Sequence, residues 1–501
     1  MASYQCSGLH IPHPNIPNAS VDFLKAHMVF NKSSFIPESA YVNHGPVNVT
    51  NVSYCVVSVT YTHTHQTDLI NTQVWLPVDN WNGRLMGLGG GGFWCGLYPA
   101  NMMVMLGVVG EGYAAVSTDC GHTMRQNLDD WLLKSPGEID VQLLDEFAGV
   151  SLNEAAFIGK SVAESFYGAY PDHSYFSGCS QGGRQAMMLA QRYPDAYDGI
   201  VASAPATNWA ELLLCELDHL TNSAIHSCDD LDGVHDDIVS DIDACKFDAY
   251  DMIGMDILCG EQTVRLSEAA AIVATAAWQG PVFRNDKYLW TGVDIVSNLT
   301  SSCGLPVRYS SDWIRLAVLK DPKADLHDMS HDGFVQIFSQ SVQEYNSVIG
   351  TRNPNLTEFA HRGGKILSFH LGSSHQISDR ADPMIPSRGT RRYYESVAAI
   401  DPSVRRYYRL FEAPGLGHCW SSSGLYPSTI FDDMVDWVER GQAPDYLPAS
   451  FTDEDGVEQS RILCPYPERA VYNKSGDSTS RSSYFCNAEE PDFRSIIRPN
   501  D

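Results

Sequence analysis

The 501-residue sequence contains no apolar run long enough to cross a membrane, and it has few basic residues. Its nearest approach to such a run, residues 102–109, stops at Gly110-Glu111, whereas a transmembrane helix needs about 20 apolar residues. Lys and Arg number 33 against 61 Asp and Glu, which gives a net charge of −28. Nucleic acids and anionic membranes are both bound through clustered basic side chains, so neither is an expected partner.

The chain also lacks internal repeats and low-complexity tracts. With 44% apolar residues it has ample material for a core, which excludes disorder of the whole chain. Residues 1–6 show neither the basic nor the apolar part of a signal peptide.

Thirteen cysteines are many for a protein of a reducing compartment. Seven Asn-x-Ser/Thr sequons are compatible with a secreted glycoprotein, at Asn18, Asn31, Asn48, Asn51, Asn298, Asn355 and Asn473. We therefore expect a secreted protein whose leader is missing from this sequence. The alternative is an intracellular protein with reduced thiols.

The order of the expected elements indicates an α/β fold. Residues 1–50 are rich in Pro, Asn and Ser and are predicted to form an extended arm. Strands are predicted within 53–76 and at 84–88, 113–118, 175–177, 199–204, 364–370 and 407–411, and helices at 153–167 and 183–193. Strands that alternate with helices indicate a parallel sheet. The alternation lapses over 208–363, so we predict one sheet domain, formed by 1–207 and 364–501, that this segment interrupts.

A candidate nucleophile lies between a predicted strand and a predicted helix. The segment Gly178-Cys179-Ser180-Gln181-Gly182-Gly183 fits G-x-S-x-G, which in this context is a nucleophile elbow. Small residues allow the strained turn that presents the hydroxyl of Ser180. The free N–H groups of the following helix N-terminus can stabilise an oxyanion.

The partners of such a serine follow it in the order acid, then His. His418, in the Gly-rich segment 415–420, is the preferred base. Asp379 and Asp382 both qualify as the acid, and Asp382 is preferred because Asp382-Pro383 resembles a turn between a strand and a helix. Cys179 precedes Ser180 and Cys419 follows His418, so we predict a disulfide that links nucleophile and base, since bonded cysteines have Cα atoms about 4.4–6.8 Å apart.

Together these motifs resemble the tannase/feruloyl esterase family of serine esterases. The similarity spans about residues 6–486 and is carried by GCSQGGRQAMMLAQRYPDAYDGIVASAP (178–205), STDCGH (117–122) and CPYP (464–467). It implies an α/β-hydrolase fold in which 208–363 form an inserted lid domain. It also implies a carboxylic ester hydrolase acting on small-molecule or plant-polymer esters of aromatic acids such as ferulate or gallate.

The resemblance assigns roles to individual residues. Ser180 becomes the nucleophile, Asp382 the acid and His418 the base. The oxyanion hole would use the N–H of Gln181 and that of a glycine within 89–92, either Gly90 or Gly91. The implied disulfides are Cys6–Cys55, Cys179–Cys419, Cys228–Cys245 and Cys464–Cys486.

An acidic loop follows Cys228, with five Asp within 229–237. It does not have the spacing of an EF-hand, and from composition alone it could be a solvated turn. The resemblance implies a structural Ca²⁺ site, with the carboxylates of Asp229, Asp232 and Asp236 and the backbone carbonyls of Val234 and Ile238 as ligands.

The sequence departs from the family pattern between His370 and Asp382. Residues 371–381 look like an insertion, either a genuine loop or an artefact of the gene model. If the insertion displaces Asp382, the chain would be a catalytically inactive homologue acting as a binding protein. A further alternative is an intracellular esterase of small-molecule biosynthesis with the same fold. Cysteines without an assigned partner are Cys95, Cys120, Cys215, Cys259 and Cys303.

Aromatic residues of the segment 208–363 could line a substrate pocket or form the core of the lid: Trp209, Trp278, Phe283, Tyr288, Trp290, Tyr309, Trp313, Phe334 and Phe338.

Overall fold

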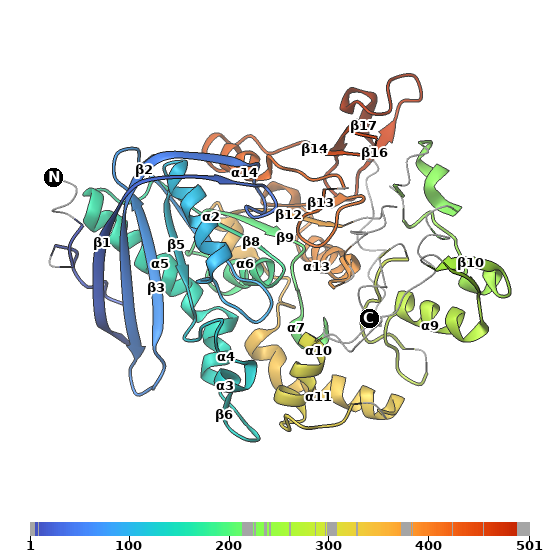
Figure 1. Cartoon of the computed structure of the whole chain (residues 1–501), viewed down its shortest axis with the longest axis horizontal. Coiled ribbons are helices and arrows are strands. Elements are labelled where there is room, and N and C mark those ends of the chain that lie inside the picture. Colours follow the sequence, from blue (N-terminus) through green and yellow to red (C-terminus); the bar gives the residue numbers. More distant parts are fainter. Residues whose placement is uncertain are drawn as a thin grey trace.

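The computed structural model describes residues 6–8, 10–212, 224, 227–234, 238–239, 242–259, 262–285, 287–295, 297, 308–326, 329–371, 382, 384–422, 424–453 and 455–487. Its centre is a nine-stranded sheet in the order β1-β2-β3-β5-β4-β8-β9-β12-β13 (Figure 1). The strands are β1 (Ala19–Ile36), β2 (Val47–His63), β3 (Ile70–Pro77), β4 (Arg84–Leu88), β5 (Ala114–Thr118), β8 (His173–Cys179), β9 (Gly199–Ser203), β12 (Lys365–Leu371) and β13 (Tyr408–Ala413). The pairs β1–β2, β2–β3 and β3–β5 are antiparallel, and the remaining pairs of the sheet are parallel.

Helices cover both faces of this sheet, as an α/β fold requires. On one face lie α2 (Pro99–Gly110) and α14 (Ile430–Arg440), which share an apolar core with the strands. On the other lie α5 (Val150–Tyr167), α6 (Gln181–Arg192) and α13 (Ser387–Ile400). The α/β-hydrolase fold expected from the sequence is confirmed by this architecture together with the structural comparisons reported below.

Shorter elements surround this core. Between β5 and β8 come α3 (Leu128–Leu132), β6 (Leu133–Ser135), β7 (Glu138–Ile139) and α4 (Val141–Ala148). Between β9 and β12 come α7 (Trp209–Leu212), η1 (Asp229–Asp232), η2 (Ala249–Met252), β10 (Asp256–Cys259), β11 (Gln262–Arg265), α9 (Glu268–Gln279), α10 (Arg308–Asp312), η4 (Trp313–Val318), α11 (His331–Ile349) and α12 (Thr357–His361). The C-terminal part adds η5 (Val404–Arg406), β14 (Leu447–Thr452), β15 (Glu458–Leu463), β16 (Arg469–Tyr472), η6 (Arg481–Ser483) and β17 (Tyr484–Asn487).

The prediction of an extended arm over 1–50 is wrong. Strand β1 runs along the outer edge of the sheet, antiparallel to β2 (Figure 1). Its residues Leu24, Ala26 and Met28 alternate toward the apolar core beneath the sheet. This period of two is a strand signal that the Pro- and Asn-rich composition around it concealed.

The segment between β9 and β12 contributes, in its described part, no strand to the central sheet. The parallel pairing of β9 with β12 therefore joins parts of the chain on either side of that segment. The carboxyl ends of β8, β12 and β13 lie at the same edge of the sheet, because these strands are parallel. Ser180, Asp382 and His418 follow those three strands along the chain.

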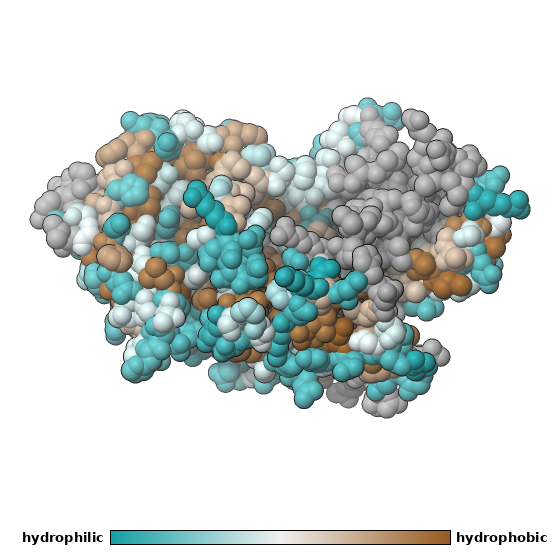
Figure 2. Space-filling view, turned by 60° about the horizontal axis from the view of Figure 1, so that its bottom comes forward, coloured by the Kyte–Doolittle hydropathy of each residue, from teal (hydrophilic) through white to brown (hydrophobic). Residues whose placement is uncertain are grey.

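One face of the molecule exposes a group of hydrophobic residues (Figure 2). Figure 2 shows hydrophobic residues gathered near the middle of one face, between largely hydrophilic ones. Among the described helices, none combines the length and the apolar character needed to cross a membrane.

Candidate active site

Ser180 occupies a strained turn between β8 and α6. Its φ is 61° and its ψ is −121°, a backbone conformation with positive φ that residues other than glycine rarely adopt. The turn is tight: a Cβ added to Gly178 would lie 2.5 Å from the carbonyl carbon of Gly182, and one on Gly183 would lie 2.6 Å from the carbonyl oxygen of Ser203. Glycine at both positions therefore permits the nucleophile elbow that the motif predicts.

Asp382 and His418 form a direct contact. Nδ1 of His418 lies 2.6 Å from Oδ2 of Asp382. The other carboxylate oxygen, Oδ1, accepts hydrogen bonds from the N–H groups of Met384 (2.8 Å) and Ile385 (2.9 Å). With its carboxylate held in this way, Asp382 is oriented toward the imidazole. Asp379, the other predicted acid, and residues 372–381 lie outside the described part of the chain.

A second histidine faces the same carboxylate and was missed by the sequence reasoning. Nε2 of His370, at the end of β12, lies 3.5 Å from Oδ2 of Asp382, and its Nδ1 lies 2.6 Å from Oγ1 of Thr390. Burial alone would raise the pKa of the Asp382 carboxyl, but His418 and His370 beside it hold that pKa well below its usual range. For His418 burial acts to lower the pKa, and the Asp382 carboxylate outweighs it, so that the pKa is raised.

The disulfide predicted between Cys179 and Cys419 is present, with Cα atoms 5.8 Å apart. It joins the residue before Ser180 to the residue after His418, across 240 positions of sequence. Ser180 and His418 both line one cavity. The bridge thus ties the two catalytic candidates together directly at the site.

The other three pairings implied by the resemblance are also present: Cys6–Cys55, Cys228–Cys245 and Cys464–Cys486. A fifth bridge, Cys95–Cys120, was not predicted. It joins the segment after the glycine stretch 89–92 to the residues after β5. Cys215 and Cys303 lie outside the described residues, and the side chain of Cys259 is not described.

The cavity at Ser180 has a volume of about 340 Å³. Trp209, Leu212 and Tyr309, which follow β9, form part of its wall, and Tyr98 stands at the start of α2. Of the aromatic residues considered for the pocket, only Trp209 and Tyr309 line this cavity. Trp278, Trp290, Trp313 and Phe338 are buried away from this cavity. Trp278 packs in a core formed by residues of its own segment, whereas Trp313 belongs to the core beneath the sheet helices.

The oxyanion candidates are only partly as expected. The N–H of Gln181 makes no hydrogen bond within the described chain, as a donor at a helix N-terminus should. The N–H of Gly90, however, donates to Oε1 of Gln185 (2.8 Å), and that of Gly91 to the carbonyl of Trp94 (3.1 Å). The expectation is therefore corrected for both glycines, because the N–H of Gly90 is bound by a buried side chain and that of Gly91 by a backbone carbonyl.

Arg184 supports the first turn of α6 and was also missed. Its side chain is fully buried, and it donates to Oε1 of Gln181 and to the carbonyls of Phe147 and Ala148. Burial lowers the pKa of this guanidinium to about 9. The run Gln-Gly-Gly-Arg-Gln (181–185) directly after the nucleophile was the available signal, since charged and amide side chains are unusual on a buried helix.

The acidic loop is described in part. The carboxylate of Asp229 is buried, at 1% exposure, as are Val234 and Ile238, and the Cys228–Cys245 bridge closes the loop. The backbone of Asp232 lies in η1. Asp236 lies outside the described residues.

A nucleophile elbow followed by an Asp–His pair, at the carboxyl edge of a mostly parallel sheet, is the arrangement typical of hydrolases with the α/β-hydrolase fold. The sequence profile described as "Tannase and feruloyl esterase" matches residues 55–214 and 211–487. The chain therefore belongs to the tannase and feruloyl esterase family, and it is a carboxylic ester hydrolase.

Individual relatives agree with this placement. The chain is 35% identical over 474 residues to a probable feruloyl esterase of Arthroderma benhamiae, covering 87% of this chain and 86% of the relative. It is 26% identical to a tannase of Aspergillus oryzae, covering 89% and 87%. Among solved structures, the tannin acyl hydrolase of Aspergillus niger superposes with a TM-score of 0.84 at 25% identity, covering 100% of this chain and 99% of that one. Feruloyl esterase B of Aspergillus oryzae gives 0.79 at 25% identity, covering 97% and 100%.

Proposed function

We propose that this protein hydrolyses esters of phenolic acids, such as ferulate or gallate, through a serine-bound acyl intermediate. The observation that carries the proposal is the cavity of about 340 Å³ that contains Ser180 and His418 and has Tyr98, Trp209 and Tyr309 in its wall. Aromatic walls suit the ring of such an acid. The names of the relatives, feruloyl esterase and tannase, support the same substrate class.

In the proposed mechanism, the hydroxyl oxygen of Ser180 attacks the ester carbonyl while His418 takes its proton. Asp382 holds Nδ1–H of His418 and stabilises the imidazolium that forms. The developing oxyanion accepts a hydrogen bond from the N–H of Gln181, with the second donor in the Gly91–Gly92 turn. In that turn the N–H of Gly92 is the available donor, because it makes no hydrogen bond within the described residues. His418 then protonates the leaving alcohol, and water releases the acid by the reverse steps.

A panel of methyl ferulate, methyl gallate and a simple alkyl ester, compared by kcat/KM, tests the substrate class. We expect the two aromatic esters to exceed the alkyl ester in kcat/KM. With an activated nitrophenyl ester as a separate substrate, the burst of nitrophenol release should disappear in Ser180→Ala. Equal kcat/KM across the panel would refute the assignment of phenolic esters. A burst that persists in Ser180→Ala would refute the nucleophile.

The geometry also bears on the inactive alternative. That alternative required residues 371–381 to displace Asp382, but the carboxylate lies 2.6 Å from the imidazole of His418. We therefore retain a catalytic rather than a binding role.

We further propose a structural Ca²⁺ in the loop after Cys228. The described part of the loop supports such an ion, because a carboxylate as deeply buried as that of Asp229 requires donors or a cation, and carboxylate and carbonyl oxygens are the ligands that Ca²⁺ prefers. The carboxylates of Asp229, Asp232 and Asp236 and the carbonyls of Val234 and Ile238 would hold it. EGTA should lower Tm and Ca²⁺ should restore it, while Asp229→Asn should abolish the response. A Tm that does not respond to EGTA would exclude the ion.

We propose that the protein is secreted and glycosylated. Five disulfides in the described chain suit an oxidising compartment. The sequon asparagines that the structure describes are all exposed, at positions 18, 31, 48, 51, 355 and 473. A protein recovered from the medium of its native host, with a mass that falls on treatment with a glycosidase, is the expected result. Recovery of unmodified protein from cell lysate alone would contradict it.

A further inference from the structure

Within the glycine stretch 89–92, Gly90 is hydrogen-bonded to α6, the helix that follows Ser180. The carbonyl of Gly90 accepts a hydrogen bond from the N–H of Gly182 (2.9 Å), and the N–H of Gly90 donates to Oε1 of Gln185 (2.8 Å). Gly182 and Gln185 both belong to α6, the helix that starts directly after Ser180. Both backbone polar groups of Gly90 are therefore bound by the helix that carries the nucleophile.

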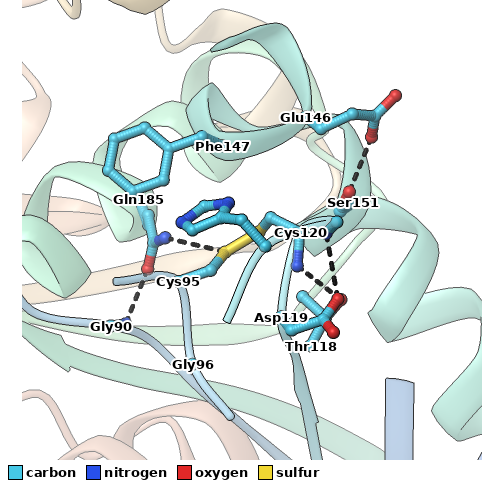
Figure 3. The surroundings of a disulfide bond; sticks show 12 residues. Gly90, Cys95, Gly96, Thr118, Asp119, Cys120, Glu146, Phe147, Ser151 and Gln185 are labelled. Carbon is cyan, nitrogen blue, oxygen red and sulfur yellow. Dashed lines mark hydrogen bonds between the residues drawn. A yellow bond between two sulfur atoms is a disulfide. The ribbon is translucent and has the colours of Figure 1, made fainter. Parts of the chain in front are cut away.

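Gln185 also reaches the bridge that the sequence did not predict. Its Nε2 lies 3.4 Å from Sγ of Cys95, which is bonded to Cys120 (Figure 3). Gln185 and Cys120 are fully buried and Cys95 is 2% exposed. One amide side chain thus connects α6, the glycine stretch and the end of β5. A buried amide with both ends bonded has a single orientation, because any rotation leaves a polar group unpaired.

Other side chains hold the carbonyl groups of the same loop. Nδ2 of Asn101 donates to the carbonyls of Gly96 (2.7 Å) and Gly89 (3.3 Å). Nε2 of His122 lies 2.9 Å from the carbonyl of Phe93. Burial lowers the pKa of His122 to about 4, so this imidazole is neutral near pH 7 and its Nε2–H is the donor. Among these side chains, Gln185 is the one that binds an N–H of the glycine stretch.

The loop has little freedom to move away from this arrangement. A Cβ added to Gly90 would lie 1.6 Å from the carbonyl oxygen of Cys95, and one added to Gly89 would lie 2.7 Å from Cα of Gly182. The backbone segments therefore touch directly. A side chain that sets where Gly90 sits also sets where the adjoining Gly91–Gly92 turn sits at the cavity.

From these contacts we propose that Gln185 is a positioning residue for the oxyanion hole. It binds the N–H of Gly90, which removes that group from the set of oxyanion donors, and with the Cys95–Cys120 bridge it holds the following turn in place beside Ser180. The inference rests on the proposed function, since it assumes ester hydrolysis at Ser180. It predicts that Gln185 acts on the tetrahedral transition state and not on binding of the ground-state ester.

The test compares Gln185→Met, Gln185→Glu and the control Gln191→Met. Gln191 lies on the same helix and makes two hydrogen bonds through Nε2, to the carbonyl of Thr351 and to Oη of Tyr393, away from the glycine stretch. Gln185→Met removes both contacts, whereas Gln185→Glu keeps an acceptor for the N–H of Gly90. Each variant is assayed for kcat and KM on methyl ferulate, for inhibition by an arylboronic acid, whose adduct with serine mimics the tetrahedral state, and for Tm.

We expect Gln185→Met to lower kcat about 10²-fold, the cost typical of a displacement of about 1 Å at a catalytic group. KM should change less than about twofold, and the boronic acid should bind more weakly by a factor similar to that in kcat. Gln185→Glu should recover most of kcat, and Gln191→Met should leave kcat and inhibition unchanged. Wild-type kcat in Gln185→Met, or an equal loss in Gln191→Met, would overturn the proposal.

If Gln185→Met does not fold, a second variant tests the same proposal. The double variant Cys95→Ala/Cys120→Ala removes the sulfur contact and the bridge, and we expect kcat to fall at nearly constant KM. Unchanged kcat in this folded variant would overturn the role of the bridge in positioning. Failure of the proposed function is distinguishable, because the wild-type enzyme itself would then show no burst of nitrophenol release.

Discussion

The carboxylate of Asp382 lies 2.6 Å from Nδ1 of His418, although eleven residues that look inserted, 371–381, separate it from His370 in the preceding strand. Two backbone N–H groups, from Met384 and Ile385, anchor its other oxygen. The acid is therefore held from its C-terminal side, where the chain enters α13. This relationship explains how an altered loop can leave the Asp–His pair in place.

Asp382→Asn should lower kcat about 10⁴-fold, because the imidazole then loses both its orientation and its countercharge. Asp379→Asn is the matched control and should leave kcat within about twofold of wild type, because Asp382 already makes the contact with His418. Steady-state kinetics on methyl ferulate, with circular dichroism to verify folding, checks both. A large loss in Asp379→Asn with normal Asp382→Asn would reassign the acid.

The pH profile should carry the signature of the Asp–His pair. Asp382 raises the pKa of His418 above 6.5, and the base must be neutral to accept the proton of Ser180. Activity should therefore fall as pH drops through this raised pKa. In Asp382→Asn the midpoint of the acidic limb should move to lower pH, because the carboxylate no longer favours the imidazolium. The profile of kcat/KM against pH measures the shift, and an unmoved midpoint would refute the coupling.

The long-range bridge Cys179–Cys419 and the short-range bridge Cys464–Cys486 should differ in their effects on stability and on activity. By loop-closure entropy, loss of Cys179–Cys419, which spans 240 residues, should cost about 5 kcal/mol in the free energy of unfolding. Loss of Cys464–Cys486, which spans 22, should cost about 3 kcal/mol. Paired Cys→Ala variants in denaturant titrations check the ranking. Only the first pair should also lower kcat, and an equal kcat loss in the second would contradict the catalytic role of the first.

A buried group of charges near the β2–β3 turn should make stability depend on pH. Hydrogen bonding to Glu154 is the main cause that raises the pKa of His63 to about 9, with Asp68 adding to it, while burial raises the pKa of Glu146 to about 8. Both folded-state pKa values exceed the unfolded ones. Each group therefore stabilises the fold fully below its unfolded pKa, and this contribution is lost as pH rises through the folded value.

The free energy of unfolding should accordingly fall between about pH 4.5 and pH 9, through Glu146 from about pH 4.5 to 8 and through His63 from about pH 6.5 to 9. His63→Gln should be less stable at pH 6 and should show a shallower decline, whereas His27→Gln, at an exposed position of β1, should behave as wild type. Denaturant titrations at a series of pH values measure this. Stability that increases toward pH 9 would show that the charges do not act as inferred.

Much of the catalytic centre could be predicted because its signals are local. The glycines around Ser180 determine the turn through backbone sterics alone, and Cys179 and Cys419 mark the residues that must approach each other. The alternation of strands and helices placed β8, β9, β12 and β13 in a parallel sheet, since each strand carries its own apolar run. These features depend on neighbours a few positions apart, and such short-range preferences are readable in one chain.

What the tertiary structure alone decided are the contacts between distant segments. Gly90 and Gln185 are 95 positions apart, and neither residue signals that the N–H of one is bound by the amide of the other. The same holds for Cys95–Cys120, for His370 beside Asp382, and for the pairing of β1 with β2. Many pairings of polar groups satisfy the same local preferences, and only the packing of the whole core selects which of them are buried together.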